Sequence, residues 1–302
     1  MKHLLKMGDL RKDDIIEILD LADKLKTEKK AGVPHHLLAG KTLGMIFQKA
    51  STRTHVSFEV GMYELGGYPL FLSSNDLQIG RGEPIEDTAR VLSRYLDGIM
   101  IRTFAQKEVE DLANFGSIPI INGLTDFAHP CQVLADFMTI REYKKSFDGL
   151  KMAYIGDGNN MANSLIVGGL TLGMEVACAI PDGYLPDASV LAGAKGNPKF
   201  SISGDVCAAA KDADVLFTDV WASMGQEAQI AKRRADFAGI QINRDVLSVA
   251  KPDVMVQHCL PAHREEEITA EVFEAHAQEI FDEAENRLHA QKAVMVLLMG
   301  NK

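Results

Sequence analysis

Three hydroxyl groups and a guanidinium stand together in Ser51-Thr52-Arg53-Thr54, after a short apolar run and at the start of a helix-like stretch. A helix start adds free backbone amides and a favourable dipole, so this set of donors suits a phosphate dianion. Ser51 or Thr52 could also serve only as a helix cap. A cap explains one hydroxyl but not the adjacent arginine, so we favour an anion site.

Two other positions in the first half are weaker when taken alone. Arg102-Thr103 ends an apolar run, where a surface arginine is the ordinary interpretation. His129-Pro130-Cys131-Gln132 opens an amphipathic stretch, and its histidine could donate to a carbonyl oxygen or could equally be a packed residue. Neither position, taken on its own, predicts a function.

The second half contains a glycine-rich turn, Gly156-Asp157-Gly158-Asn159-Asn160, between an apolar run and a helical pattern. It superficially resembles a dinucleotide-binding turn, but Met161 stands where the fingerprint needs a third glycine, and a lone G-x-G is weak. We favour asparagines that bind a polar substrate.

Two more clusters end apolar runs in the second half. The first, Asp219-Val220-Trp221-Ala222-Ser223-Met224-Gly225, offers a carboxylate, a hydroxyl and the only tryptophan of the chain, although an ordinary loop is the plain alternative. The second is His258-Cys259-Leu260-Pro261. Its cysteine could be a nucleophile or a ligand, but a buried small apolar residue is the default.

Alternation of short apolar runs with amphipathic stretches predicts the scaffold for these clusters. Such alternation indicates βαβ units and mainly parallel sheets, and ligands bind beyond the carboxyl ends of such strands. After a first helical pattern at Asp9–Lys30, the expected strands of the first half are Thr42–Phe47, Pro69–Leu72, Gly98–Arg102 and Pro119–Asn122. Its other expected helices are Thr54–Leu65, Pro84–Leu96, Glu108–Phe115 and Pro130–Tyr143.

The pattern pauses at residues 144–149 and restarts, which predicts two domains that meet near Gly149. The second half has expected strands at Met152–Ile155, Glu175–Ile180, Val215–Val220 and Val254–Cys259, and a long final helix at Ala277–Leu298. We therefore expect an α/β protein with two doubly wound domains, each a mainly parallel sheet flanked by helices.

Composition narrows the class of protein. The 302 residues are 46% apolar, and 32 basic against 42 acidic residues give a formal charge of −10, which argues against nucleic-acid binding. No apolar stretch predicts a signal peptide or a membrane span. Four scattered cysteines indicate neither a zinc site nor a disulfide scaffold. We expect a soluble, cytoplasmic protein.

Together these stretches resemble the aspartate/ornithine carbamoyltransferase family, in its ornithine-type form, over essentially the whole chain. Residues 51–54 resemble the carbamoyl-phosphate signature, and 219–225 and 258–261 resemble the ornithine-type motifs. Three further segments also match the family's pattern in its order: Leu77-Gln78-Ile79-Gly80, Asp87-Thr88-Ala89-Arg90-Val91-Leu92 and Asn122-Gly123-Leu124.

The resemblance implies an enzyme that transfers a carbamoyl group from carbamoyl phosphate to the side-chain amine of ornithine, as in arginine biosynthesis. It implies residues 1–148 as the carbamoyl-phosphate-binding domain, 149–284 as the ornithine-binding domain, and 285–302 as a C-terminal helix that packs back on the first. It implies no metal and no cofactor, no nucleic-acid or membrane partner, and a homo-oligomer built from trimers.

The family's roles transfer to matching positions. The phosphate would bind Ser51, Thr52, Arg53 and Thr54. The carbamoyl group would bind Thr54, Arg102, His129, Gln132 and Arg287, and Gln78 would reach a neighbouring subunit's site. Ornithine would bind Asn160, Asp219, Ser223 and Met224. Cys259 and the carbonyl of Leu260 would lie near the reacting amine and the bound carbamoyl phosphate, with Cys259 orienting the amine.

His55 departs from the family, which usually has arginine there, and puts phosphate affinity in question. The Ser223–Gly225 loop with Gln226–Arg234 is our candidate lid. Three alternatives stay open: a carbamoyltransferase for putrescine or N-acetylornithine, a nucleotide-dependent oxidoreductase, and a catalytically silent relative that acts as a partner protein.

Overall fold

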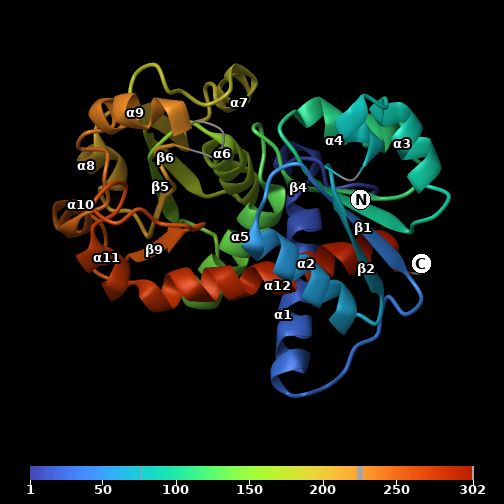
Figure 1. Cartoon of the computed structure of the whole chain (residues 1–302). Coiled ribbons are helices and arrows are strands. Elements are labelled where there is room, and N and C mark those ends of the chain that lie inside the picture. The colour runs from blue at the N-terminus through green and yellow to red at the C-terminus, as the bar shows by residue number, and fades with distance from the viewer. Residues whose placement is uncertain (76, 223–226, 301–302) are drawn as a thin grey trace. The chain divides into compact units, whose positions relative to one another are not determined.

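The computed structural model describes residues 1–75, 77–222 and 227–300. They form two compact units (Figure 1), one of residues up to 138 together with residues 286–300, and the other of residues between 139 and 285. Each unit contains a parallel sheet flanked by helices, which confirms the expected fold class.

The sheet of the first unit has the strand order β2-β1-β3-β4, and all its pairings are parallel. The strands are β1 (Thr42–Phe47), β2 (Tyr68–Ser73), β3 (Gly98–Arg102) and β4 (Ile120–Leu124). The helices are η1 (Met7–Asp9), α1 (Lys12–Lys30), α2 (Thr52–Glu64), η2 (Gln78–Arg81), α3 (Ile85–Leu92), α4 (Gln106–Phe115) and the start of α5 (Pro130–Lys144).

The last helix, α12 (Ala277–Met299), begins in the second unit and ends in the first, where it packs as expected. Gly61 of α2 makes close packing possible there. A Cβ at Gly61 would lie 3.1 Å from Cγ of Lys292 and 3.1 Å from Cε of Met295. This packing lies near the C-terminal end of α2, and Arg287, earlier on α12, reaches Thr54 at the start of α2.

The sheet of the second unit has the order β7-β6-β5-β8-β9, which is the doubly wound arrangement with the first strand in the middle. The strands are β5 (Lys151–Ile155), β6 (Glu175–Ala179), β7 (Phe200–Ser203), β8 (Val215–Thr218) and β9 (Met255–His258). The helices are α6 (Asn160–Leu172), α7 (Ala188–Ala194), α8 (Val206–Ala210), η3 (Glu227–Gln229), α9 (Ile230–Asp236), α10 (Arg244–Val249) and α11 (Ala270–Ala275).

Each unit has its own core, in which alternate apolar residues of the strands pack against the helices that cover that face of the sheet. Because the strands within each sheet are parallel, their carboxyl ends lie on one edge. That edge carries the polar clusters of the sequence: 51–54, 102 and 129 in the first unit, and 156–160, 219 and 258–260 in the second. No helix in the described part of the chain has the length and hydropathy needed to cross a bilayer.

Candidate active site

The turn between β1 and α2 is both a helix cap and a donor cluster. Ser51 is the N-cap of α2, and its Oγ accepts from the amide of Thr54 at 3.2 Å. The same Oγ donates to Oγ1 of Thr54 at 3.1 Å. The capping interpretation is therefore correct for Ser51, while Thr52 is exposed and Arg53 is half-buried at the same helix start.

His129 is a buried histidine of the first unit that lies near three arginines. It is buried, and burial holds the pKa of its imidazole well below the ordinary value of 6.5. Three nearby guanidinium groups lower this pKa further because they repel a second positive charge; in order of effect they belong to Arg287, Arg102 and Arg53. The imidazole is therefore neutral at physiological pH, among three cations.

Arg287 reaches this cluster from α12. Its Nη2 donates to Oγ1 of Thr54 at 3.0 Å, and both side chains are buried. Arg102 ends β3, where it pairs with Phe47 of β1, and is 8% exposed. The structure thus brings together Arg53, Thr54, Arg102, His129 and Arg287, which are separated by up to 234 positions in the sequence.

Two other predicted carbamoyl-phosphate residues have different surroundings. Gln132 is buried in the first turn of α5, and its Nε2 donates to Oδ1 of the buried Asp136 at 2.8 Å. Gln78 is exposed in η2.

Lys49 is a buried cation that sequence reasoning missed. It follows β1 by two residues, is 6% exposed, forms an ion pair with Asp126 and lies 4.2 Å from the ring centroid of Phe104. The sequence signal that could have found Lys49 was its position between a strand end and the Ser51 cluster. It adds positive charge to the same turn.

Asp219 is the centre of the cluster in the second unit. Its Oδ2 accepts from Nδ2 of Asn159 at 2.8 Å. Its Oδ1 accepts from Sγ of Cys259 at 3.0 Å and from the amide of Val220 at 2.8 Å. Because Sγ donates to a carboxylate, Cys259 is in the thiol form here, which does not suit a nucleophile.

Asn159, which precedes the predicted Asn160, makes the connection to Asp219. Asn159 is also the N-cap of α6, and its Oδ1 accepts from the amides of Met161 and Ala162. Asn160 is half-buried at the first position of the helix. The predicted ornithine residues Ser223 and Met224, and part of the candidate lid, lie outside the described residues.

His258 orients the segment that carries Cys259 and Leu260. Its Nδ1 accepts from the amide of Leu260 at 2.9 Å, so in the neutral ring Nε2 bears the hydrogen. Nε2 lies 3.0 Å from Oε1 of Glu267, and both side chains are fully buried. Leu260 has a φ of +57°, an uncommon backbone conformation for a branched side chain, and this pair of bonds holds it there.

A second buried ion pair, which sequence reasoning missed, lies beside this cluster. Nη1 of Arg233 donates to Oδ2 of Asp157 at 2.8 Å and to the carbonyl oxygen of Trp221 at 2.6 Å. Burial raises the pKa of Asp157 to about 6, although the guanidinium of Arg233 opposes this rise. At neutral pH Asp157 is still ionised.

The glycine-rich turn after β5 is closed by the protein's own backbone. A Cβ at Gly158 would lie 2.2 Å from the carbonyl oxygen of Tyr184 and 2.4 Å from the backbone of Leu185 and Pro186. The glycine is therefore needed for contact with residues 184–186, where a dinucleotide fold needs it for approach to a pyrophosphate. Together with the buried carboxylate of Asp157, this packing argues against a nucleotide site.

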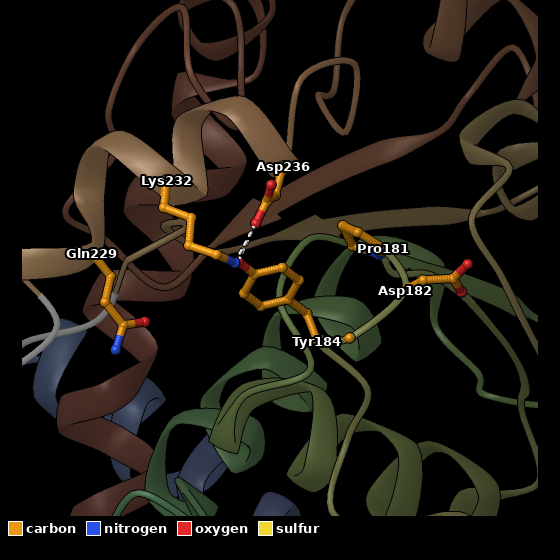
Figure 2. Close-up of a pocket in the computed structure, with 7 residues that line it drawn as sticks. Pro181, Asp182, Tyr184, Gln229, Lys232 and Asp236 are labelled. Atoms are coloured by element: carbon orange, nitrogen blue, oxygen red, sulfur yellow. Dashed lines mark hydrogen bonds and ion pairs between the residues drawn. The ribbon is translucent and has the colours of Figure 1, made fainter.

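A pocket of about 700 Å³ lies on the second unit between the turn after β6 and α9 (Figure 2). It is lined by Pro181, Asp182, Gly183, Tyr184, Gln229, Lys232 and Asp236. These residues include none of the positions predicted to bind substrate.

His263, Glu266 and Glu267 are close enough to hold a metal ion. Both carboxylates already have protein partners: Oε1 of Glu266 accepts from Nη2 of Arg234 at 2.6 Å, and Glu267 accepts from His258 and from the amide of His263. These hydrogen bonds within the protein explain why the three side chains lie close together.

Comparison with known proteins identifies the family. Residues 2–142 match the family model described as the aspartate/ornithine carbamoyltransferase carbamoyl-P binding domain, and residues 148–298 match the Asp/Orn binding domain of the same family. The chain therefore belongs to the aspartate/ornithine carbamoyltransferase family. The arginine cluster lies in the part matched by the first model, and the Asp219 cluster in the part matched by the second.

Close relatives and solved structures have the ornithine-type name. The chain is 54% identical to ornithine carbamoyltransferase of Thermococcus kodakarensis, over 99% of this chain and 96% of the relative, and 56% identical to that of Methanosarcina mazei, over 99% of both. The structure of ornithine carbamoyltransferase from Pyrococcus furiosus is similar with a TM-score of 0.95 and 53% identity, over 100% of this chain and 98% of the other.

Proposed function

We propose that this chain transfers the carbamoyl group of carbamoyl phosphate to the side-chain amine of L-ornithine and forms L-citrulline and phosphate. The observation that carries the proposal is the cluster of Arg53, Arg102 and Arg287 around a neutral His129, in the half of the chain that matches a carbamoyl-P binding domain. The names of the relatives support the same reaction.

In the proposed reaction, the neutral amine attacks the carbonyl carbon and gives a tetrahedral intermediate with a negative oxygen. The nitrogen–carbon bond forms, the bond from carbon to the phosphate oxygen breaks, and the leaving phosphate takes the proton of the amine. Donors aimed at the negative oxygen stabilise it by about 3–4 kcal/mol each. Arg102, Thr54 and an N–H of neutral His129 supply such donors.

We propose that the Asp219 cluster of the second unit binds the amino-acid substrate. A carboxylate there suits the α-amino group of an amino acid, and Cys259, bonded to the same carboxylate, helps to orient the side-chain amine. Putrescine lacks the α-amino and α-carboxylate groups, and N-acetylornithine lacks the free α-amino group. Both would leave polar groups of the site unpaired, which disfavours them.

Initial rates of formation of the carbamoylated amine from carbamoyl phosphate test the proposal. Ornithine, putrescine and N-acetylornithine are compared at equal concentration. The expected result is turnover with ornithine and at least about 100-fold lower kcat/KM with the other two amines. Faster turnover of putrescine or N-acetylornithine would mean that this amine, and not ornithine, is the substrate. No turnover of any amine would contradict the proposed carbamoyl transfer.

We also propose that the protein is a homo-oligomer built from trimers. An exposed apolar surface on the first unit supports this assembly, since one face of α2 and the edge strand β2 expose large side chains, namely Val56, Val60, Tyr63, Tyr68 and Phe71. Val56, Val60 and Tyr63 follow one another at helical spacing on α2, and exposed apolar side chains grouped in this way mark contacts with other chains. Gln78, exposed in η2, is the residue that we expect to enter the neighbour's site.

Subunit complementation tests this assembly. Gln78→Ala and Arg53→Ala chains are expected to be inactive separately. Co-expressed in equal amounts, they should recover about a quarter of wild-type activity, since about one site in four then combines an intact Arg53 with a neighbour's intact Gln78. A monomeric mass by light scattering, or no recovery, would contradict the proposal.

We further propose a cytoplasmic location, which the thiol state of Cys131, Cys178, Cys207 and Cys259 supports.

A further inference from the structure

Arg233 joins two segments that each lie two residues from the substrate cluster of the second unit. Asp157 precedes Asn159 by two residues, and Trp221 follows Asp219 by two residues. Asn159 and Asp219 are themselves hydrogen-bonded at 2.8 Å. The single Nη1 of Arg233 therefore bridges the same two chain segments that this pair joins.

The guanidinium of Arg233 is fixed by its surroundings. Its side chain is 8% exposed and lies 4.9 Å from the ring centroid of Tyr184 and 5.9 Å from that of Phe237. The hydroxyl of Tyr184 donates to Asp236 at 2.6 Å and accepts from Lys232 at 2.9 Å, and the tips of these three side chains lie close together in Figure 2. These contacts set the position of α9, and hence of Arg233.

Trp221 makes two independent hydrogen bonds. Its carbonyl oxygen accepts from Arg233, and its Nε1 donates to the carbonyl oxygen of Ile240 at 3.1 Å. With the backbone fixed at Trp221, the carboxylate of Asp219 can accept from Asn159 and from Cys259 at the same time. Loss of the bridge would release one of the two segments that this geometry requires.

We propose that Arg233 is a positioning residue for the amino-acid substrate: through Asp157 and Trp221, it sets the arrangement of Asn159, Asp219 and Cys259. This inference rests on the proposed function and assigns a specific step, binding of the α-amino acid, to a residue that need not touch the substrate. Binding of carbamoyl phosphate, which uses the first unit, does not depend on it.

Four variants test this role. Arg233→Gln removes the charge, and Asp157→Asn removes its partner with little change in shape. Arg233→Lys keeps a cation with enough hydrogens for both acceptors. Arg244→Gln is the control, because Arg244 lies in the same unit outside the candidate lid and its side chain, 79% exposed, pairs with Glu271.

The expected kinetic result is a change confined to one substrate. Arg233→Gln and Asp157→Asn should raise KM for ornithine by about tenfold or more, because each leaves a buried charged group without its partner. KM for carbamoyl phosphate should stay within about twofold in both variants, and Arg233→Lys should recover most of the ornithine affinity. Arg244→Gln should match the wild type. Equal increases in both KM values, together with a lowered melting temperature, would reduce the pair to a purely structural ion pair and overturn the proposal.

Trp221 gives a second measurement that does not depend on turnover. It is the only tryptophan of the chain and is 7% exposed, so its fluorescence reports this segment. Titration with ornithine should change its emission in the wild type, and Arg233→Gln should need about tenfold more ornithine for the same change. If Arg233→Gln does not fold, Asp157→Asn and Arg233→Lys provide the same comparison.

The two proposals fail in different ways. A wild-type protein that binds ornithine by fluorescence but makes no citrulline would overturn the proposed function and leave the positioning role open to the titration of the variants. A wild-type protein that makes citrulline, with variants that keep wild-type ornithine affinity in both measurements, would overturn only the role of Arg233.

Discussion

Nη2 of Arg287 donates to the hydroxyl of Thr54 at 3.0 Å, so a residue near the end of the chain completes the helix start that carries the carbamoyl-phosphate signature. The same guanidinium has the largest effect among the three that repel a proton on His129. Arg287 therefore acts on two neighbours: it holds a hydroxyl in place, and it adds to burial, the larger cause, in lowering the pKa of the imidazole.

Arg287→Gln is expected to lower kcat/KM for carbamoyl phosphate by about 10²–10³, because a buried positive charge near the developing negative oxygen is lost and Thr54, one of its donors, loses the bond that holds it. Steady-state kinetics at saturating ornithine measure this change. Arg11→Gln is the control, since the side chain of Arg11 is 80% exposed and pairs only weakly with Asp14 in water. An effect of Arg287→Gln as small as that of the control would contradict a role in the site.

The stability of the protein should depend on pH through His129. Its pKa in the folded chain lies below the ordinary value of 6.5, so below pH 6.5 the unfolded chain binds a proton that the folded chain does not. The free energy of unfolding should therefore fall as the pH decreases from 6.5 to about 5, and this residue should contribute no pH dependence above 6.5.

His129→Asn should make that decrease shallower, because asparagine does not titrate, and should also lower kcat. Urea unfolding at several pH values measures the first effect, with His263→Asn as an exposed control. Parallel pH curves for the wild type and His129→Asn would mean that the folded imidazole is not depressed in pKa.

His55→Arg should alter KM for carbamoyl phosphate less than Arg53→Ala does. The ring of His55 stacks on Phe71 with centroids 4.3 Å apart, and its Nε2 lies 2.9 Å from Oε2 of Glu59. These two contacts explain the position of the His55 side chain, and neither of them involves a residue of the anion cluster. Steady-state kinetics that give the reverse order of effects would mean that His55 contributes directly to phosphate binding.

Glu64→Gln should destabilise the first unit by about 3 kcal/mol, because it leaves a buried cation without its counter-charge. Nζ of Lys292 is fully buried and lies 2.7 Å from Oε2 of Glu64, with the imidazole of His35 beside it. Chemical denaturation measures the loss. Glu59→Gln is the control on the same helix, since Glu59 is half exposed.

A Glu64→Gln/Lys292→Met double variant should be more stable than Glu64→Gln alone, because the buried cation is removed together with its partner. Equal stability of the single and double variants would contradict this account of the pair.

The sequence predicted the strands well where they are short, apolar and buried. β1 and β3 have the bounds expected for Thr42–Phe47 and Gly98–Arg102, since continuous buried runs give a strong pattern. β7 was not expected, because Phe200–Ser203 alternates between half-buried and exposed at the edge of its sheet and contains two serines. Pro84–Leu96 was expected as one helix, but α3 ends at Leu92 and a turn follows.

The polar clusters were predictable as strand ends, but their internal bonds were not. Nothing in Gly156–Asn160 shows that Asn159 bonds to Asp219, or that Asp157 pairs with an arginine 76 positions later. Such partners are set by tertiary packing and leave no local periodicity. Lys49 was missed for the same reason: a lysine after a strand is ordinarily exposed, and only the fold shows it buried against Phe104.

The first unit is discontinuous, since residues 286–302 join it after the second unit has been completed in sequence. A ribosome releases the N-terminal residues first, so the nascent chain carries Arg53, Arg102 and His129 long before Arg287 exists to join them. The anion cluster is therefore assembled only after the second unit has been made, and a truncated fragment that stops at residue 138 lacks one of its three arginines.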